Sequence, residues 1–148
     1  MIYLLIALDN IGFILYNESR GFILTLIMEI LRMQEFEIIF YDKADGTEPA
    51  KDFILGLDLK MRTKMLRIID MLRINGNNLR EPESKPIGDG IMELRAKVGG
   101  NISRVLYFFV VGHKVILTNG FIKKTKKTPI IEIERAKQYR AEYLSRKE

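Results

Sequence analysis

Residues 91–122 read IMELRAKVGGNISRVLYFFVVGHKVILTNGFI and contain the clearest strand and turn signals of the chain. From Met92 to Lys97, apolar and charged side chains alternate, which is the period of a β-strand with one buried face and one face that can meet solvent or a ligand. Turn signals at 99–101 and 112–114 separate this strand from two further apolar runs, 103–111 and 115–122. The stretch therefore predicts a three-stranded antiparallel meander.

Residues on either side of this stretch predict one more strand and three helices. Residues 35–41 form a β-branched and aromatic run followed by a polar turn, which is typical of a strand. Apolar residues then recur at helical spacing after Thr47, which we expect to cap a short helix, and again in a longer stretch that ends at Gly76. Thr128, which precedes a proline, is expected to cap a last helix.

Between the second helix and the meander, residues 78–90 contain two prolines and are expected to form a polar loop. The order of elements is therefore β-α-α-β-β-β-α. This order predicts an α+β domain over residues 34–148, with a small antiparallel sheet covered on one side by helices. Basic residues on the outer face of the second helix indicate either a solvated face or a phosphate-binding surface.

The composition excludes several kinds of site. The chain has 148 residues, the size of one ordinary domain, with no cysteine and a single histidine, His113. These counts exclude a disulfide framework, a thiol nucleophile and a metal site built from thiolates or several histidines. His113 lies in a predicted turn and is assigned no catalytic role. The net charge of +5 favours a polyanionic or acidic partner, and we expect neither a cofactor nor a metal.

Residues 1–33 differ from the rest of the chain in charge and pattern. They hold two arginines against three carboxylates, a net charge of −1, so residues 34–148 carry +6. Their apolar runs are each too short to span a bilayer, and no secretory signal is expected. The codons of residues 28–29 must include a purine-rich stretch resembling a ribosome-binding site shortly before Met33. We hypothesise that residues 1–32 are translated upstream sequence; the alternative is a genuine N-terminal hairpin or amphipathic helix that covers the domain.

Charged side chains inside the apolar meander are the main local clue to function. Arg104 is the one charge within residues 103–111, and across the predicted hairpin it lies beside Glu93 or Arg95. One interpretation is an ion pair between Glu93 and Arg104 at the sheet edge, and the other is a ligand-binding role. The two interpretations are compatible.

A second clue is the presence of four lysines within residues 123–127. Clustered ammonium groups repel one another unless an anion neutralises them, so a phosphate partner is one interpretation and a solvated loop is the other. If the chain cuts RNA without a thiol or a metal, an arginine must offset the charge on the reacting phosphate. A lysine of lowered pKa would then transfer a proton, and Glu93 is a candidate base.

Four spaced motifs resemble a known family. The chain reads GIMELR at 90–95, GNISRVLYFF at 100–109, GFIKKTKKTP at 120–129 and EIERA at 132–136. Together they resemble the RelE/HigB superfamily of type II toxins, and within it the branch of phage-derived HigB-like proteins. The resemblance extends from about Glu35 to Tyr143 and leaves out residues 1–33.

The resemblance implies a compact microbial RNase-type fold and an mRNA interferase, a ribosome-dependent endoribonuclease that inhibits translation. By position, it implies that Arg95, Arg104 and Lys123 or Lys124 bind the scissile phosphate and stabilise its transition state. Better-known relatives have lysine where this chain has Glu93, which leaves the proton-transfer groups open. For Tyr139 and Tyr143 the alternatives are stacking on a base and core packing. The candidate RNA-binding residues are Lys85, Lys97, Lys126, Lys127, Tyr139 and Tyr143.

The implied partners are mRNA on the ribosome and a helix-turn-helix antitoxin of the HigA type, through which the complex would bind operator DNA. The expected location is cytoplasmic, without a membrane. Two alternatives remain at this point. One is a ParE-like toxin that acts on DNA gyrase by protein contact, and the other is an inactive prophage remnant.

Overall fold

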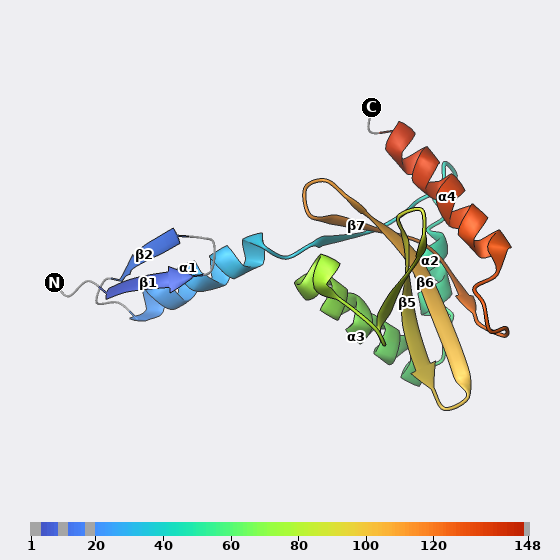
Figure 1. The fold of residues 1–148 in the computed structure, drawn as a ribbon, viewed down its shortest axis with the longest axis horizontal. Coiled ribbons are helices and arrows are strands. Elements are labelled where there is room, and N and C mark those ends of the chain that lie inside the picture. Colours follow the sequence, from blue (N-terminus) through green and yellow to red (C-terminus); the bar gives the residue numbers. More distant parts are fainter. Residues whose placement is uncertain (1–3, 9–11, 17–19, 147–148) are drawn as a thin grey trace. The chain divides into compact units, whose positions relative to one another are not determined.

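The computed structural model describes residues 4–8, 12–16 and 20–146 and divides into two compact units, Met1–Glu35 and Phe36–Glu148. The first unit contains an antiparallel hairpin and a helix (Figure 1). A start at Met33 stays a prediction. No helix among the described residues is long and apolar enough to cross a membrane. The elements of this unit are β1 (Leu4–Leu8), β2 (Gly12–Tyr16) and α1 (Arg20–Met33).

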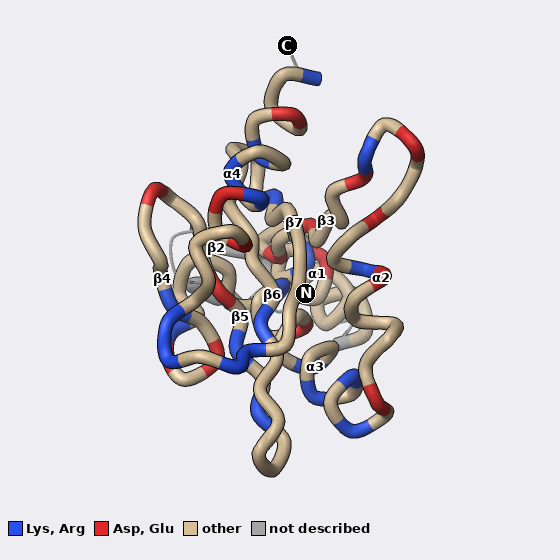
Figure 2. The backbone as a smooth tube through the Cα atoms, turned by 90° about the vertical axis from the view of Figure 1, so that its right-hand side faces the viewer, with Lys and Arg blue, Asp and Glu red and all other residues tan. Residues whose placement is uncertain are grey.

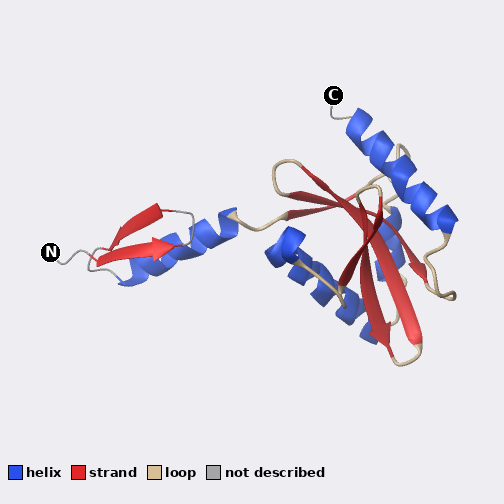
Figure 3. Ribbon diagram, viewed as in Figure 1, coloured by secondary structure: helices blue, strands red, loops and turns tan. Residues whose placement is uncertain are grey.

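The second unit is built on a five-stranded sheet with the strand order β3-β7-β6-β5-β4 (Figure 3). β3 pairs with β7 in parallel, and the other three pairs are antiparallel. The strands are β3 (Glu37–Phe40), β4 (Ser84–Gly88), β5 (Ile91–Val98), β6 (Asn101–Val110) and β7 (Lys114–Ile122).

The α+β class and the predicted meander are confirmed, since β5, β6 and β7 form it in sequence order. Two expectations about the sheet are wrong. The sheet is mixed because β3 runs parallel to β7. The predicted loop at 78–90 contains β4, which pairs with β5 at the sheet edge. Pro86 fits there because an edge strand tolerates a residue without a backbone N–H.

Helices cover both faces of the sheet, so the expectation of helices on one side is wrong. Val105 and Tyr107 of β6 belong to the core that packs under α2 and α3. Their neighbours Leu106 and Phe108 point to the opposite face and pack with residues of α4. The helical elements are α2 (Pro49–Leu55), α3 (Leu59–Asn75), the short 3₁₀ turn η1 (Gly76–Asn78) and α4 (Ile130–Ser145).

The ends of α3 follow from two residues. The Asp58 side chain accepts a hydrogen bond from the Met61 N–H at 3.0 Å and caps the first turn. Gly76 ends the helix, as predicted, with a positive φ of 51°. A Cβ at this glycine would lie 1.9 Å from Cε1 of Phe36, so close packing as well as backbone conformation demands glycine.

The two predicted threonine caps are wrong. The N-cap of α2 is Glu48, and the Thr47 N–H donates to Asp45 Oδ1 at 2.9 Å within the preceding turn. The N-cap of α4 is Pro129, and the Thr128 hydroxyl donates to a carboxylate oxygen of Glu93 instead. This second contact joins the loop before α4 to strand β5.

Candidate functional site

The candidate site lies on the sheet face that α4 covers only in part. Ile91, at the start of β5, is fully buried in the core beneath α4. Alternate residues of the same strand then become charged and progressively more exposed: Glu93 is buried, Arg95 is half-buried and Lys97 is exposed. Figure 2 shows the Lys and Arg segments of β4, β5 and β6 beside one another. The exposed end of this face is therefore strongly charged.

The strand register brings four charged residues together. Arg95 of β5 pairs with Arg104 of β6, and Lys85 of β4 pairs with Glu93. Residues directly opposite each other in an antiparallel pair share a face, and Glu93 is the diagonal neighbour of Arg104. Oε1 of Glu93 lies 3.0 Å from Nε of Arg104. The expected ion pair is thus present, but it joins two inner strands and does not lie at the sheet edge.

Lys123 joins this group directly after β7. Its backbone N–H donates to the Ile102 carbonyl of β6 at 2.8 Å, which continues the β6–β7 ladder by one residue. The side chain is half-buried and interacts electrostatically with charged groups of three strands. We call the four cations that surround Glu93, namely Lys85, Arg95, Arg104 and Lys123, the basic cluster.

The surroundings of Lys123 disfavour its charged form. Burial lowers the pKa of Lys123, and the positive charges of Arg104, Arg95 and Lys85 lower it further, while Glu93 acts in the opposite direction. A lysine in this position holds its proton less tightly than an isolated lysine does. It is therefore better suited to proton transfer than an ordinary surface lysine.

Glu93 and Arg104 form the buried centre of the cluster, with side chains only 2% and 7% exposed. Burial lowers the pKa of Arg104 and the Glu93 carboxylate opposes that change, but a guanidinium stays protonated in proteins. Arg95 Nε lies 3.6 Å from the same carboxylate, and Arg95 Nη1 lies 3.7 Å from Glu81 at the rim. Four cations thus face two carboxylates, and the surplus positive charge suits a phosphate group.

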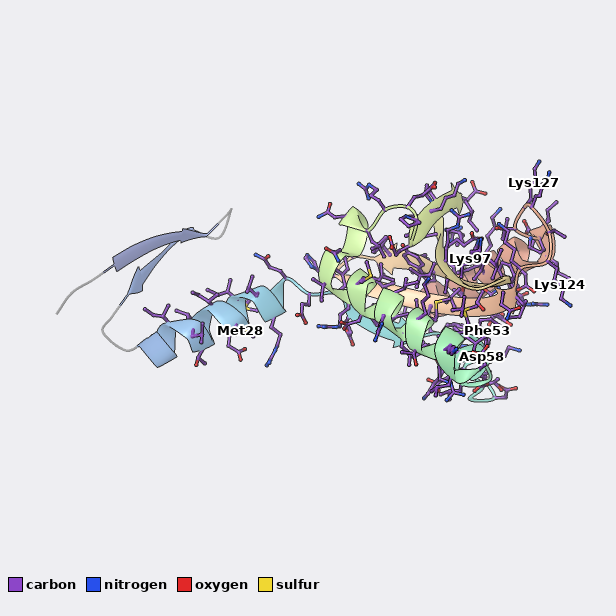
Figure 4. The ribbon with its side chains drawn as sticks, turned by 90° about the horizontal axis from the view of Figure 1, so that it is seen from below. Met28, Phe53, Asp58, Lys97, Lys124 and Lys127 are labelled. Carbon is purple, nitrogen blue, oxygen red and sulfur yellow. The ribbon has the colours of Figure 1, made fainter. Side chains whose placement is uncertain are left out.

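The loop between β7 and α4 carries the other predicted lysines. Lys124, Lys126 and Lys127 are exposed, and Lys124 and Lys127 extend outward from the loop in Figure 4. The structure therefore places Lys123 alone of the four within the basic cluster. Inside the loop, the Thr125 hydroxyl donates to the Lys127 carbonyl at 2.8 Å.

The structure places Tyr139 and Tyr143 in the core. Both are 7% exposed. Tyr139 stacks on Tyr41 with ring centroids 4.6 Å apart, and Tyr143 packs edge-on against Phe108. Neither ring offers an open face to a base in this conformation, so we leave both tyrosines out of the candidate site.

The sequence did not predict a groove of about 840 Å³ between α3 and the end of β5. Its apolar lining includes Ile68 and Met71 of α3, and the Lys64 ammonium donates to the Lys97 carbonyl at 2.7 Å. The basic face of α3 was the signal for this surface. The groove is lined by six cations and one carboxylate, namely Lys60, Lys64, Arg67, Arg95, Lys97, Arg104 and Glu83.

Sequence reasoning also missed the role of Thr128 as a donor to Glu93, because a threonine before proline has the pattern of a helix cap. Within the described part of the chain, no group of three or more Asp, Glu or His side chains is placed to hold a metal ion. The charged side chains of the site are those of the basic cluster and the buried Glu93 carboxylate.

Comparison with known proteins gives one finding. The family model described as "Phage derived protein Gp49-like (DUF891)" matches residues 52–141, which include the whole basic cluster and Glu93. No curated protein matches the chain.

Proposed function

The chain belongs to the Gp49-like family of phage-derived proteins, which is associated with RelE/HigB-like toxins, and from this premise we propose that it is the toxin of a type II toxin–antitoxin system. The activity that the site favours is endoribonucleolytic cleavage of mRNA on the ribosome, which stops translation. RelE-like toxins, to which the family is linked, are endoribonucleases.

One observation carries this proposal: the strand register and the β7 end gather the basic cluster on one accessible sheet face. A single basic residue on a strand is common, whereas three cations on β4, β5 and β6 and a fourth directly after β7 form an organised anion site around a buried carboxylate. Their charge and spacing suit a phosphodiester whose negative charge increases during reaction.

In the proposed reaction the ribose 2′-hydroxyl attacks the adjacent phosphorus, the P–O5′ bond breaks, and the products end in a 2′,3′-cyclic phosphate and a 5′-hydroxyl. Arg104 and Arg95 stabilise the extra charge on the phosphorane. Lys123, whose pKa is lowered by burial and by its cationic neighbours, exchanges a proton with the reacting oxygens. Lys124, Lys126 and Lys127 attract the RNA backbone.

The proposed antitoxin partner supplies acidic residues that neutralise the site. Residues 34–148 carry a net charge of +6, and the groove between α3 and β5 is lined by six cations and one carboxylate. Arg95 and Arg104 line both this groove and the candidate site. An acidic antitoxin segment in the groove would therefore cover two residues that RNA cleavage needs. Operator DNA would be contacted through the antitoxin.

The proposal is tested by inducing the full chain in a bacterial host and mapping new 5′ ends in cellular mRNA. Lys123→Met removes the ammonium group while keeping the side-chain length, and Lys114→Met makes the same change at the opposite end of β7. We expect codon-phased cuts with the wild type and with Lys114→Met, and their loss with Lys123→Met. Growth arrest with intact transcripts would instead favour a gyrase-directed toxin, and the absence of arrest an inactive remnant.

A further inference from the structure

Glu93 joins three separate segments of the chain. It lies on β5, its Oε1 faces Nε of Arg104 on β6 at 3.0 Å, and its Oε2 accepts a hydrogen bond from the Thr128 hydroxyl in the loop before α4. The residue is 1% exposed. A buried carboxylate must be compensated by cations and hydrogen-bond donors, and here both oxygens are occupied.

This arrangement argues against Glu93 as the general base. A base must reach the proton that it removes, either directly or through one water molecule. Glu93 has almost no exposed surface and already interacts with Arg104 through one oxygen and with Thr128 through the other. Its geometry is that of a group that holds other groups in place.

The groups that Glu93 holds are those that the proposed reaction uses. Arg104 forms an ion pair with Glu93 through Nε, although the Nε–H does not have the geometry of a hydrogen bond, and its Nη1 donates to the Ser103 carbonyl at 3.2 Å. A guanidinium has five N–H donors in a rigid plane, so fixing one side of it orients the remaining donors. Thr128 in turn closes the loop that begins with Lys123.

We propose that Thr128 is a positioning residue. By donating a hydrogen bond to Glu93, it fixes the Arg104 guanidinium and attaches the loop of residues 123–129 to the buried centre of the basic cluster. The effect of Thr128 on catalysis rests on the proposed function. The contact itself rests only on the geometry of Glu93, Arg104 and Thr128. Helix α4 does not use the Thr128 hydroxyl, since its N-cap is Pro129 and no side chain caps it.

The test compares three variants of the full chain in single-turnover cleavage of mRNA bound to purified ribosomes. Thr128→Val removes the hydroxyl at nearly constant volume, and Thr128→Ser restores it. Thr125→Val makes the same chemical change in the same loop but removes only the hydrogen bond to the Lys127 carbonyl. We expect Thr128→Val to lower the rate at saturating toxin roughly tenfold, the effect of losing one hydrogen bond to a charged group, with the half-saturating concentration unchanged.

We expect Thr128→Ser to regain most of that rate and Thr125→Val to cleave like the wild type. Equal rates for Thr128→Val and the wild type would overturn the proposal. So would a rate loss that serine fails to restore and that accompanies a fall in melting temperature, because that pattern belongs to a merely structural residue.

A second measurement does not depend on cleavage. Proton exchange at Arg104 Nε–H and backbone ¹⁵N relaxation of residues 123–129 are recorded by NMR for the wild type and the variants. We expect Thr128→Val to accelerate the exchange and loosen the loop, while Thr125→Val leaves the exchange unchanged. Unchanged exchange in Thr128→Val would refute the positioning role even if the chain proves to be a nuclease. Faster exchange in a chain that cleaves no RNA would support the positioning role while the proposed function fails.

Discussion

Replacing Arg104 by methionine tests how much the buried ion pair between Glu93 and Arg104 contributes to the free energy of unfolding. The change leaves Glu93, whose side chain is 2% exposed, without its closest cation. Breaking a buried pair by removing one partner costs about 3–5 kcal/mol, because the remaining charge stays desolvated. Arg95 Nε at 3.6 Å and the Thr128 hydroxyl still compensate part of the Glu93 charge. We therefore expect the lower end, a loss of about 3 kcal/mol in the free energy of unfolding.

The assay is urea unfolding of the full chain, followed by circular dichroism. Arg135→Met is the matched control, because the Arg135–Glu132 pair has a similar separation of 2.9 Å but the Arg135 side chain is 41% exposed. It should cost less than about 0.5 kcal/mol. Adding Glu93→Gln to Arg104→Met removes the unpaired charge and should restore about 1–2 kcal/mol.

A cost of less than about 1 kcal/mol for Arg104→Met, the range of an exposed ion pair, would show that burial does not strengthen the dependence of the fold on this pair. Further destabilisation of the Arg104→Met variant by Glu93→Gln would contradict the role of the unpaired charge, since an amide needs no counter-ion.

Three further predictions concern single sites. Burial and neighbouring cations lower the pKa of Lys123, so the unfolded chain binds more protons at this residue than the folded chain does. The free energy of unfolding of the wild type should therefore increase relative to that of Lys123→Met as the pH rises toward the unfolded pKa of 10.5. A difference in urea unfolding that stays constant with pH would contradict this. Burial and the hydrogen bond to Glu142 raise the pKa of Tyr41 to about 12. Tyr41→Phe should therefore remove the step at highest pH from an ultraviolet tyrosine titration and lower the free energy of unfolding by about 1–2 kcal/mol. An unchanged titration would exclude this assignment. Gly76→Ala should destabilise the chain more than Gly99→Ala does, because both glycines have a positive φ but only Gly76 packs against Phe36. Equal melting temperatures for the two variants would disprove the contribution of packing at Gly76.

The sequence was sufficient for elements whose pattern is local. The meander follows from the alternation in β5 and from the turn residues, and α3 follows from its apolar face and Gly76. β4 was missed because an edge strand with a proline gains its structure from pairing with β5, which no local pattern records. The parallel pairing of β3 with β7 is equally non-local.

The candidate site shows the same division. Arg104 could be placed beside Glu93 or Arg95 from the hairpin turn alone, and the register then decides that Arg95 is opposite and Glu93 diagonal. The Thr128 contact could not be predicted, because it joins residues 35 positions apart and competes with an equally plausible local role as a helix cap. The position of Lys123 also depends on a register shift between Leu106 and Tyr107 in the β6–β7 pair.

The central claim is that this chain cleaves mRNA through the basic cluster. Its most direct test is the chemistry of the RNA ends made by the purified full chain on ribosomes that carry a defined mRNA. We expect 5′-hydroxyl and 2′,3′-cyclic phosphate ends with the wild type and with Lys114→Met. We expect these ends to form at least a hundredfold more slowly with Lys123→Met, roughly the contribution of one general acid or base. Products with 5′-phosphate ends, or equal cleavage by Lys123→Met, would contradict this claim.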